Sequence, residues 1–133
     1  MRKYQNLEIW MRSHKLTLDI YDATRIHFPR EEMFALTSQI RRASSSIPTN
    51  IAEGCGRKSN TDFAHFLQIS VGSATEVEYQ LLLAKDLHYL NEETYNKHSN
   101  EIIEIRKMMV AFIKNIPQSN SRASNLEPKW KVY

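Results

Sequence analysis

The stretch RRASSSIPTNIAEGCG, residues 41–56, decides the fold of this chain. In and just before it, apolar residues recur at steps of three and four: Leu36, Ile40, Ala43, Ile47, Ile51 and Gly54. This spacing predicts the buried face of one helix. Pro48 lies inside that helix and removes a backbone donor, so we expect a kink there and a Ser44 carbonyl without its intrahelical partner. The hydroxyls of residues 44–46 would compensate in part. Two helices divided at Ser46 are the alternative.

Polar residues follow the same spacing beside this buried face: Gln39, Arg42, Ser46, Asn50 and Glu53. Surface helices usually fill such a flank with interchangeable lysine and glutamate, so this more selective set indicates specific partners. It favours assembly or ligation over catalysis. Farther along the chain, we expect Glu76 or Glu78 to pair with Arg41 or Arg42, within one chain or across an interface.

Four helices are predicted, and this segment belongs to the second. The first covers about residues 7–26, and the second starts at the acidic pair Glu31 and Glu32 and runs to Gly54 as its cap. The third, capped by Ser59 or Asn60, runs to about Tyr89. The fourth is capped by Asn91 and ends before Pro117, with this apolar stripe: Ile102, Ile105, Met109, Phe112, Ile113 and Ile116. Residues 1–117 thus form one domain, and residues 118–133 are predicted to be a flexible tail.

The third helix carries a sustained heptad seam: Phe63, Leu67, Ser70, Ala74, Val77, Leu81, Ala84 and His88. Gly72 lies in the middle of this helix, where glycine costs about 1 kcal/mol relative to alanine. We therefore expect a neighbouring backbone to pack closely there.

The first helix has more apolar surface than one bundle core covers. Ile9, Leu16, Ile20 and Ala23 lie on one side of it. A second group lies on another side: Leu7, Trp10, Met11, His14, Leu18 and Tyr21. Burial on two sides is not available to a small monomer, so this helix predicts an oligomer.

Composition and charge narrow the class of protein. A chain of 133 residues with 41% hydrophobic and 25% charged residues suits one globular domain. No apolar run approaches the roughly 20 residues that span a bilayer, and the first ten residues lack a secretory signal. The single cysteine is consistent with a reducing cytoplasm. The net charge of +3, with basic residues in excess at both ends, favours nucleic acid, although an unevenly charged surface is the alternative.

The sequence gives little support for a metal site or for a catalytic site. The five histidines form no pair at metal-ligand spacing, and no Glu-x-x-His motif occurs. Cys55 is flanked by glycines and followed by Arg57, Lys58 and a helix N-terminus, which would favour a thiolate, but no base accompanies it. An enzyme that uses Cys55 is thus a minor alternative, and we expect no catalytic residues, metal or cofactor.

The chain resembles a known family in these segments: Trp10, Tyr21, Phe28-Pro29, Glu32, Leu36, Gln39, Arg42-Ala43, Ser46-Ile47-Pro48, Asn50 to Gly54, Arg57, Phe66-Leu67, Gly72-Ser73, Glu76 and Glu78. They resemble the bacterial four-helix bundle proteins encoded in intervening sequences of large ribosomal RNA genes. The resemblance covers roughly residues 4–116 and leaves out the tail. It implies an all-α, antiparallel up-and-down bundle that assembles into a homopentameric ring. The family is similar to the accessory variability protein of diversity-generating retroelements, a basic pentamer that binds nucleic acid and a reverse transcriptase.

These observations predict a non-enzymatic homo-oligomer that binds nucleic acid, with RNA favoured, or acts as an accessory protein. Candidate nucleic-acid contacts are Arg41, Arg42, Arg57 and Lys58, with Lys129 and Lys131 from the tail. Candidate interface or polar-stripe residues are Trp10, His14, Tyr21, Gln39, Arg42, Ser46, Asn50, Glu53 and Glu76. The alternative is a scaffold that docks a partner protein, such as a reverse transcriptase, without binding nucleic acid. No membrane partner is expected.

Overall fold

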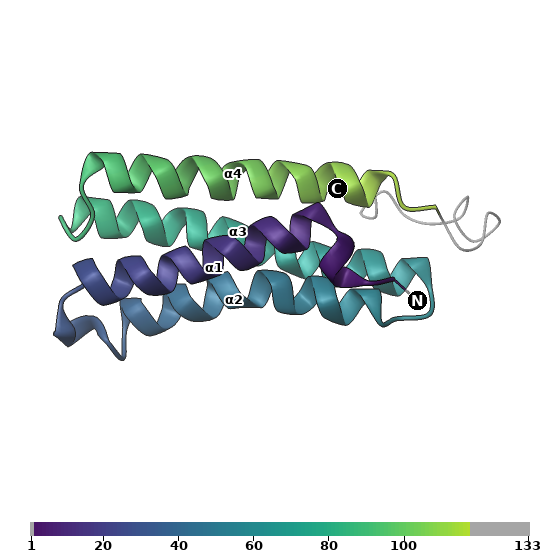
Figure 1. Ribbon diagram of the computed structural model, residues 1–133, viewed down its shortest axis with the longest axis horizontal. Helices are drawn as coiled ribbons and strands as arrows, with labels where there is room; N and C mark the ends of the chain where they lie inside the picture. The colour runs from purple at the N-terminus through teal and green to yellow at the C-terminus, as the bar shows by residue number, and fades with distance from the viewer. Residues whose placement is uncertain (1, 118–133) are drawn as a thin grey trace.

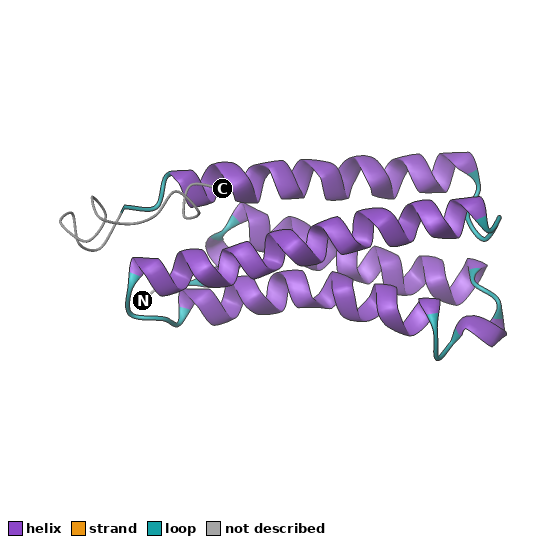
Figure 2. Ribbon diagram, turned by 180° about the vertical axis from the view of Figure 1, so that it is seen from behind, coloured by secondary structure: helices purple, strands orange, loops and turns teal. Residues whose placement is uncertain are grey.

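The computed structural model describes residues 2–117, which form a bundle of four α-helices with two short 3-10 turns. The helices are α1 (Glu8–His27), α2 (Leu36–Cys55), α3 (Asn60–Asp86) and α4 (Glu92–Lys114), and the turns are η1 (Tyr4–Asn6) and η2 (Arg30–Glu32). Consecutive helices run in opposite directions along one long axis (Figure 1). Figure 2 shows helices and loops but no strand in this part of the chain. The predicted all-α four-helix bundle is confirmed.

Consecutive helices pack against each other, and α1 also packs against α4. The core lies between them and contains the apolar face predicted for α2 and seven of the eight members of the α3 seam. The eighth, His88, is exposed and lies beyond the end of α3 with φ 68°. The prediction for His88 was wrong because α3 ends at Asp86 and the chain then turns sharply toward α4.

The helix α2 continues through Pro48 without a break, so the alternative of two helices divided at Ser46 was wrong. The Ser44 carbonyl, which loses its usual donor to the proline, accepts a hydrogen bond of 3.0 Å from the Thr17 hydroxyl of α1. The nearby serine hydroxyls bond elsewhere: Ser44 Oγ donates to the Arg41 carbonyl and Ser45 Oγ to the Arg42 carbonyl. The compensation thus comes from a neighbouring helix.

The beginning of α2 differs from the prediction. Glu31 and Glu32 belong to the separate turn η2, and α2 begins at Leu36 after Ala35 adopts φ −124° and ψ −106°. The Glu32 carboxylate accepts hydrogen bonds from the Leu36 N–H (3.2 Å) and from the Tyr89 hydroxyl (2.7 Å). These two bonds, the one from Tyr89 foremost, hold the pKa of Glu32 below its ordinary value. Glu32 thus caps α2 from outside the helix and ties it to the connection between α3 and α4.

Both predicted side-chain caps are confirmed. Ser59 accepts a hydrogen bond from the Asp62 N–H at the start of α3, and Asn91 accepts one from the Thr94 N–H at the start of α4.

Neither helical glycine has the role predicted for it. Gly54 lies inside the last turn of α2, while Gly56 is the capping residue. A Cβ atom on Gly54 would lie 3.0 Å from Phe63 Cδ1 and 3.0 Å from Phe66 Cβ, so this glycine allows α2 and α3 to approach closely. Gly72 was expected to make such an approach, but a Cβ there would meet nothing within 4 Å.

Candidate assembly face and basic end

The inward apolar group of α1 is buried in the core. The other group is only partly covered in the single chain, since Leu7 and Trp10 pack against the core while its remaining members are exposed. On the other side, Met11 is 47% exposed, Leu18 is 50% exposed and Tyr21 is 41% exposed. The hydrophobic effect disfavours this arrangement in water, because each apolar side chain buried contributes on the order of 1.5–3 kcal/mol.

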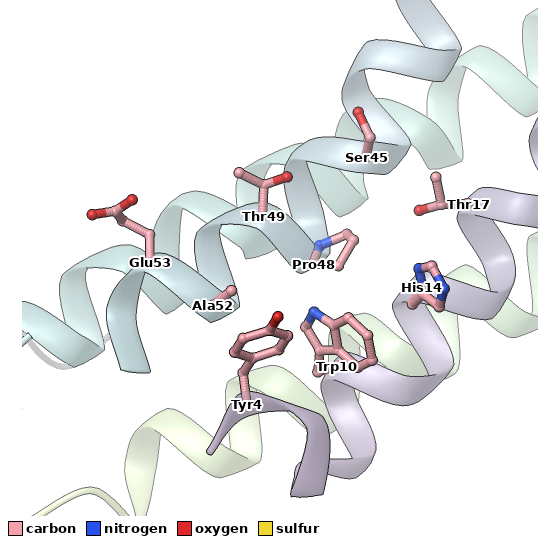
Figure 3. Close-up of a pocket in the computed structure, with 9 residues that line it drawn as sticks. All are labelled: Tyr4, Trp10, His14, Thr17, Ser45, Pro48, Thr49, Ala52 and Glu53. Carbon is pink, nitrogen blue, oxygen red and sulfur yellow. The ribbon is translucent and has the colours of Figure 1, made fainter. Parts of the chain in front are cut away.

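A groove of about 540 Å³ runs between α1 and α2 beside this surface (Figure 3). It is called the α1–α2 groove below, and its lining residues are Tyr4, Trp10, His14, Thr17, Ser45, Pro48, Thr49, Ala52 and Glu53. The rings of Tyr4 and Trp10 meet edge to face at 5.0 Å, and His14 stacks on Trp10 at 4.9 Å. Two residues predicted for an interface, Trp10 and His14, therefore form the aromatic wall of this groove.

The predicted polar stripe of α2 lies along its border with α3. In its middle, the hydroxyls of Ser46 and Ser73 are 2.9 Å apart, and the Asn50 amide donates to the Ser46 carbonyl at 2.8 Å. The remaining members, Gln39, Arg42 and Glu53, are exposed. The inner part of the stripe therefore joins α2 to α3, whereas its outer part faces solvent.

Pairing of Arg41 or Arg42 with Glu76 or Glu78 does not occur within the chain. Glu78 instead pairs with Arg106 of α4 at 3.1 Å. The prediction failed for Glu78 because α4, rather than α2, lies on its side of α3. Arg42 and Glu76 are exposed, and neither forms an ion pair in the region 2–117.

Arg41 is held against α1. Its guanidinium donates to the Thr24 hydroxyl at 2.8 Å and to the Tyr21 carbonyl at 3.4 Å, and it lies 4.7 Å from the centre of the Tyr21 ring. Because the guanidinium of Arg41 already makes these contacts within the chain, Arg41 is a poorer candidate for a phosphate contact than the exposed Arg42.

Cations gather at the end of the bundle where α2 turns into α3. Arg2 reaches this turn, because it bonds the Asn60 side chain and lies 4.0 Å from the centre of the Phe63 ring. The last turn of α4 is also there, since Phe112 packs edge to face on Phe63 at 5.9 Å. The cations at this end, called the basic end below, are Arg2, Lys3, Arg57, Lys58 and Lys114.

Two carboxylates lie close to these cations. Glu53 pairs with Arg57 at 3.0 Å, and Asp62 lies in the first turn of α3. Lys3, Lys58 and Lys114 are exposed and form no ion pair in the described chain. Sequence reasoning found Arg57 and Lys58 but missed Arg2, Lys3 and Lys114, because these come from the two ends of the domain and meet only in the fold.

The candidate cations of α2 form a separate group. Arg42 and the end of α2 at Cys55 are 13 residues apart, which corresponds to about 20 Å along a helix axis. The structure therefore does not bring Arg41 and Arg42 together with Arg57 and Lys58. The remaining candidates, Lys129 and Lys131, lie outside the described residues, as does the rest of the predicted tail.

The opposite end of the bundle is acidic and apolar. Its carboxylates are Asp22, Glu31, Glu32, Asp86, Glu92 and Glu93, and its cations are Arg25, Arg30, Arg41 and Lys85. Phe34, between η2 and α2, is 94% exposed, and Met33 beside it is 49% exposed. The charge of the molecule is thus distributed unevenly along its long axis, with cations in excess at the basic end and carboxylates in excess at the opposite end.

Cys55 does not have the environment expected of a nucleophile. Its side chain is 1% exposed and packs in the core, and this burial raises the pKa of its thiol. The expectation of a stabilised thiolate was therefore wrong. In the region 2–117, no group of three or more His, Cys, Asp or Glu side chains is arranged to hold a metal ion. No helix in this region is both long and apolar enough to cross a bilayer.

Comparisons with known proteins agree on a family. A family model described as 23S rRNA-intervening sequence protein matches residues 5–111. The fold is similar to the crystal structure of a protein of unknown function from the S23 ribosomal protein family of Bacteroides thetaiotaomicron, with a TM-score of 0.75 and 29% sequence identity. The match covers 80% of this chain and 99% of that chain. No protein with curated function matches.

Proposed function

Because the chain belongs to the 23S rRNA-intervening sequence protein family, we propose that it is a cytoplasmic, non-enzymatic homo-oligomer that binds nucleic acid, with RNA as the preferred ligand. The observation that carries this proposal is the basic end. Cations from three parts of the sequence meet there, and three of these cations, Lys3, Lys58 and Lys114, have no ion-pair partner within the described chain. Clustered, exposed lysine and arginine side chains are what a phosphate backbone binds.

Assembly would strengthen this binding. The basic end carries few charges, so one copy alone would bind weakly. Copies that share one assembly present several such ends to the same nucleic acid, and each further contact then becomes effectively intramolecular. The exposed apolar surface of α1 supports assembly. The family resemblance favours five copies in a ring.

A gel-shift assay with single-stranded RNA, duplex RNA and duplex DNA tests the proposal. We expect binding at about 50 mM salt that weakens steeply as salt rises, because binding releases counterions from the phosphates. The double variant Lys58→Glu/Lys114→Glu should lose this binding. Arg30→Glu/Lys97→Glu changes the net charge equally but at the acidic end and on the adjoining part of α4, and it should retain binding.

Two results would contradict the proposal. One is the absence of any shift at low salt for all three nucleic acids. The other is an equal loss in both double variants, which would mean that overall charge, and not the basic end, governs the interaction.

A protein-docking scaffold is the second candidate function. The observation that favours it is Phe34, which is almost fully exposed and lies beside the exposed Met33. Exposed apolar side chains that lie together mark sites of protein interaction. This candidate predicts that the wild-type chain captures one partner protein, such as a reverse transcriptase, that Phe34→Ser abolishes this capture, and that no nucleic acid is shifted.

A further inference from the structure

We infer that the acidic end of the bundle docks a cationic protein segment that carries large apolar side chains, while the basic end stays free for nucleic acid. The surface that makes this contact is called the tip patch below. It combines exposed apolar side chains with free carboxylates: Ile26, Met33, Phe34 and Leu87, with Glu31, Asp86 and Glu93. The inference rests on the docking function above, whose partner it describes by chemistry, and it does not depend on nucleic-acid binding.

The two connections that carry the tip patch are joined to each other. Phe34 lies between α1 and α2, and Leu87 lies between α3 and α4, at the same end of the bundle (Figure 1). The Phe28 ring packs on the Tyr89 ring at 5.5 Å, and the Tyr89 hydroxyl donates to the Glu32 carboxylate at 2.7 Å. These contacts hold both connections together. Because the patch lies at the tip, an assembly through the sides of the bundle leaves it uncovered.

The apolar side chains of the tip patch are exposed far more than a folded core requires. Phe34 is 94% exposed and Ile26 is 66% exposed, with Met33 and Leu87 close to half exposed. Water disfavours such surface, and apolar side chains that gather on one surface mark sites of protein interaction. Phe34 therefore has the exposure of an anchor for a partner.

The charges of the tip patch select a cationic partner. Three carboxylates of this end are already engaged: Asp22 with Arg25, Glu92 with Lys85 and Glu32 with Tyr89. Three others are exposed and form no ion pair in the described chain: Glu31, Asp86 and Glu93. Against them stands one free cation, Arg30, because Arg41 is held by Thr24. The imidazoles of His27 and His88 are exposed there too and count as neutral at pH 7. Lysine or arginine of a partner would complement this surface, whereas phosphates would be repelled.

A second copy of this chain does not offer the required combination. Outside the tip patch, the large apolar side chains exposed in residues 2–117 all lie on α1 and α3. Every lysine and arginine of these two helices is already in an ion pair: Arg12, Lys15, Arg25 and Lys85. The basic end has free lysines but none of these exposed apolar side chains. Two tip patches facing each other would oppose like charges. The occupant is therefore a different protein.

Methyl NMR with synthetic peptides tests this inference on the whole chain. The probe is a short peptide of lysine and leucine, and peptides of glutamate and leucine and of lysine and serine, equal in length, are the controls. With isotope-labelled methionine methyl groups, the signal of Met33 should move when the lysine–leucine peptide is added. Met11 on α1 is a matched reference, being 47% exposed against 49% for Met33, and its signal should stay. Neither control peptide should move the Met33 signal.

Substitutions then separate the apolar contribution from the charged one. Phe34→Ser should weaken binding of the lysine–leucine peptide by about tenfold or more, whereas Leu82→Ser, on the exposed side of α3, should not. Glu31→Gln/Glu93→Gln should weaken it as well. The matched control Glu76→Gln/Glu104→Gln removes the same charge from exposed positions outside the tip patch and should bind like the wild type. All replaced side chains are exposed, so helical circular dichroism should be unchanged.

Four results would overturn the inference. The first is a Met11 signal that moves as far as that of Met33, and the second is unchanged peptide binding by Phe34→Ser. The third is a Met33 signal that moves with single-stranded RNA, which would assign the tip patch to nucleic acid. The fourth is a lower assembled mass for Phe34→Ser, which would assign it to a second copy.

The gel-shift assay keeps this inference separate from the nucleic-acid proposal. Phe34→Ser should shift RNA like the wild type, because Phe34 lies at the opposite end from the basic end. Absence of peptide binding with the RNA shift intact would remove the docking partner and leave the nucleic-acid proposal standing. Peptide binding at Met33 without any RNA shift would support the docking partner and contradict the nucleic-acid proposal.

Discussion

At the residue scale, a single hydroxyl explains how α2 tolerates its proline. Pro48 leaves the Ser44 carbonyl without an intrahelical donor, and such a buried acceptor is costly when it is unpaired. Thr17, itself buried, shares its one hydroxyl proton between that carbonyl and the Ser13 carbonyl of its own helix, in a bifurcated hydrogen bond. The side chain that satisfies the helix therefore also joins α1 to α2 directly under the groove.

Removing that hydroxyl should destabilise the fold. Thr17→Val keeps the shape of the side chain but leaves the Ser44 carbonyl unpaired, so we expect the free energy of unfolding to fall by about 1–3 kcal/mol. In a Pro48→Ala background the alanine N–H replaces the missing donor, and the cost of Thr17→Val should become smaller. Urea denaturation of the four proteins in this double-mutant cycle measures the coupling, and purely additive effects would contradict the account.

His98 should make stability depend on pH. It is buried on α4, and burial lowers the pKa of its imidazole, with Lys97, Lys15 and His27 acting in the same direction and Asp19 in the opposite one. The unfolded chain, with an ordinary pKa of about 6.5, takes up a proton before the folded chain does. The contribution of His98 is therefore complete above about pH 7 and is lost as the pH falls toward the lowered value.

The corresponding experiment compares urea midpoints between about pH 7.5 and pH 5. His98→Gln should flatten the profile relative to the wild type. His65→Gln removes an exposed imidazole from α3 and should leave the profile as it is. A profile for His98→Gln that matches the wild type would exclude His98 as its source.

At the element scale, packing between helices determines which positions need glycine. Gly54 lies where α2 crosses close to α3, against Phe63 and Phe66. Gly72 lies in a longer helix with open space above it. The same residue type thus serves a contact within the chain at one position and leaves a surface open at the other.

Alanine substitutions at the two glycines should act in opposite directions. Gly54→Ala forces atoms to move apart at distances of 3.0 Å, so it should lower the melting temperature despite the better helix propensity of alanine. Gly72→Ala meets no neighbour and should raise the stability of the dissociated chain by up to about 1 kcal/mol. Thermal unfolding at a concentration low enough to keep copies apart measures both, and equal shifts would contradict this difference in packing.

The sequence was sufficient for the helices and for two of their caps, but not for the start of α2, the end of α3 or the basic end. The seam from Phe63 to Ala84 and the caps at Ser59 and Asn91 depend on local spacing, which can be read along the chain. The start of α2 depends on the bond between Tyr89 and Glu32, 57 residues apart. Cys55 has charged neighbours in sequence, yet its side chain points into the core. Contacts between distant segments decide such features, and no local pattern encodes them.

At the scale of the whole molecule, apolar surface and charge are distributed along different directions. Charge varies along the long axis, from the basic end at the turn between α2 and α3 to the acidic end around η2. The uncovered apolar side chains of α1 instead run along the length of that helix, beside the groove. Copies can therefore pack side against side and still present their basic ends together. The proposal therefore combines assembly through the side of the bundle with nucleic-acid binding at its basic end.

A charge placed on the apolar surface of α1 should separate the copies. Leu18→Lys introduces a cation where we expect burial between chains, so the assembled mass should fall while the helical content is kept. Leu82→Lys is a matched control, since Leu82 is 39% exposed on α3, which does not pack against α1. Sedimentation velocity of both variants measures the difference. Equal sedimentation of Leu18→Lys and the wild type would contradict a role for this surface.

The most direct test of the central claim, that the uncovered apolar surface of α1 is buried between copies, is the mass of the wild-type chain in solution. Light scattering over a hundredfold range of concentration measures it without any substitution. The account predicts a mass several times that of the 15.6 kDa chain, and the family resemblance favours a fivefold mass. A mass of 15.6 kDa that does not rise at the highest concentration would contradict it.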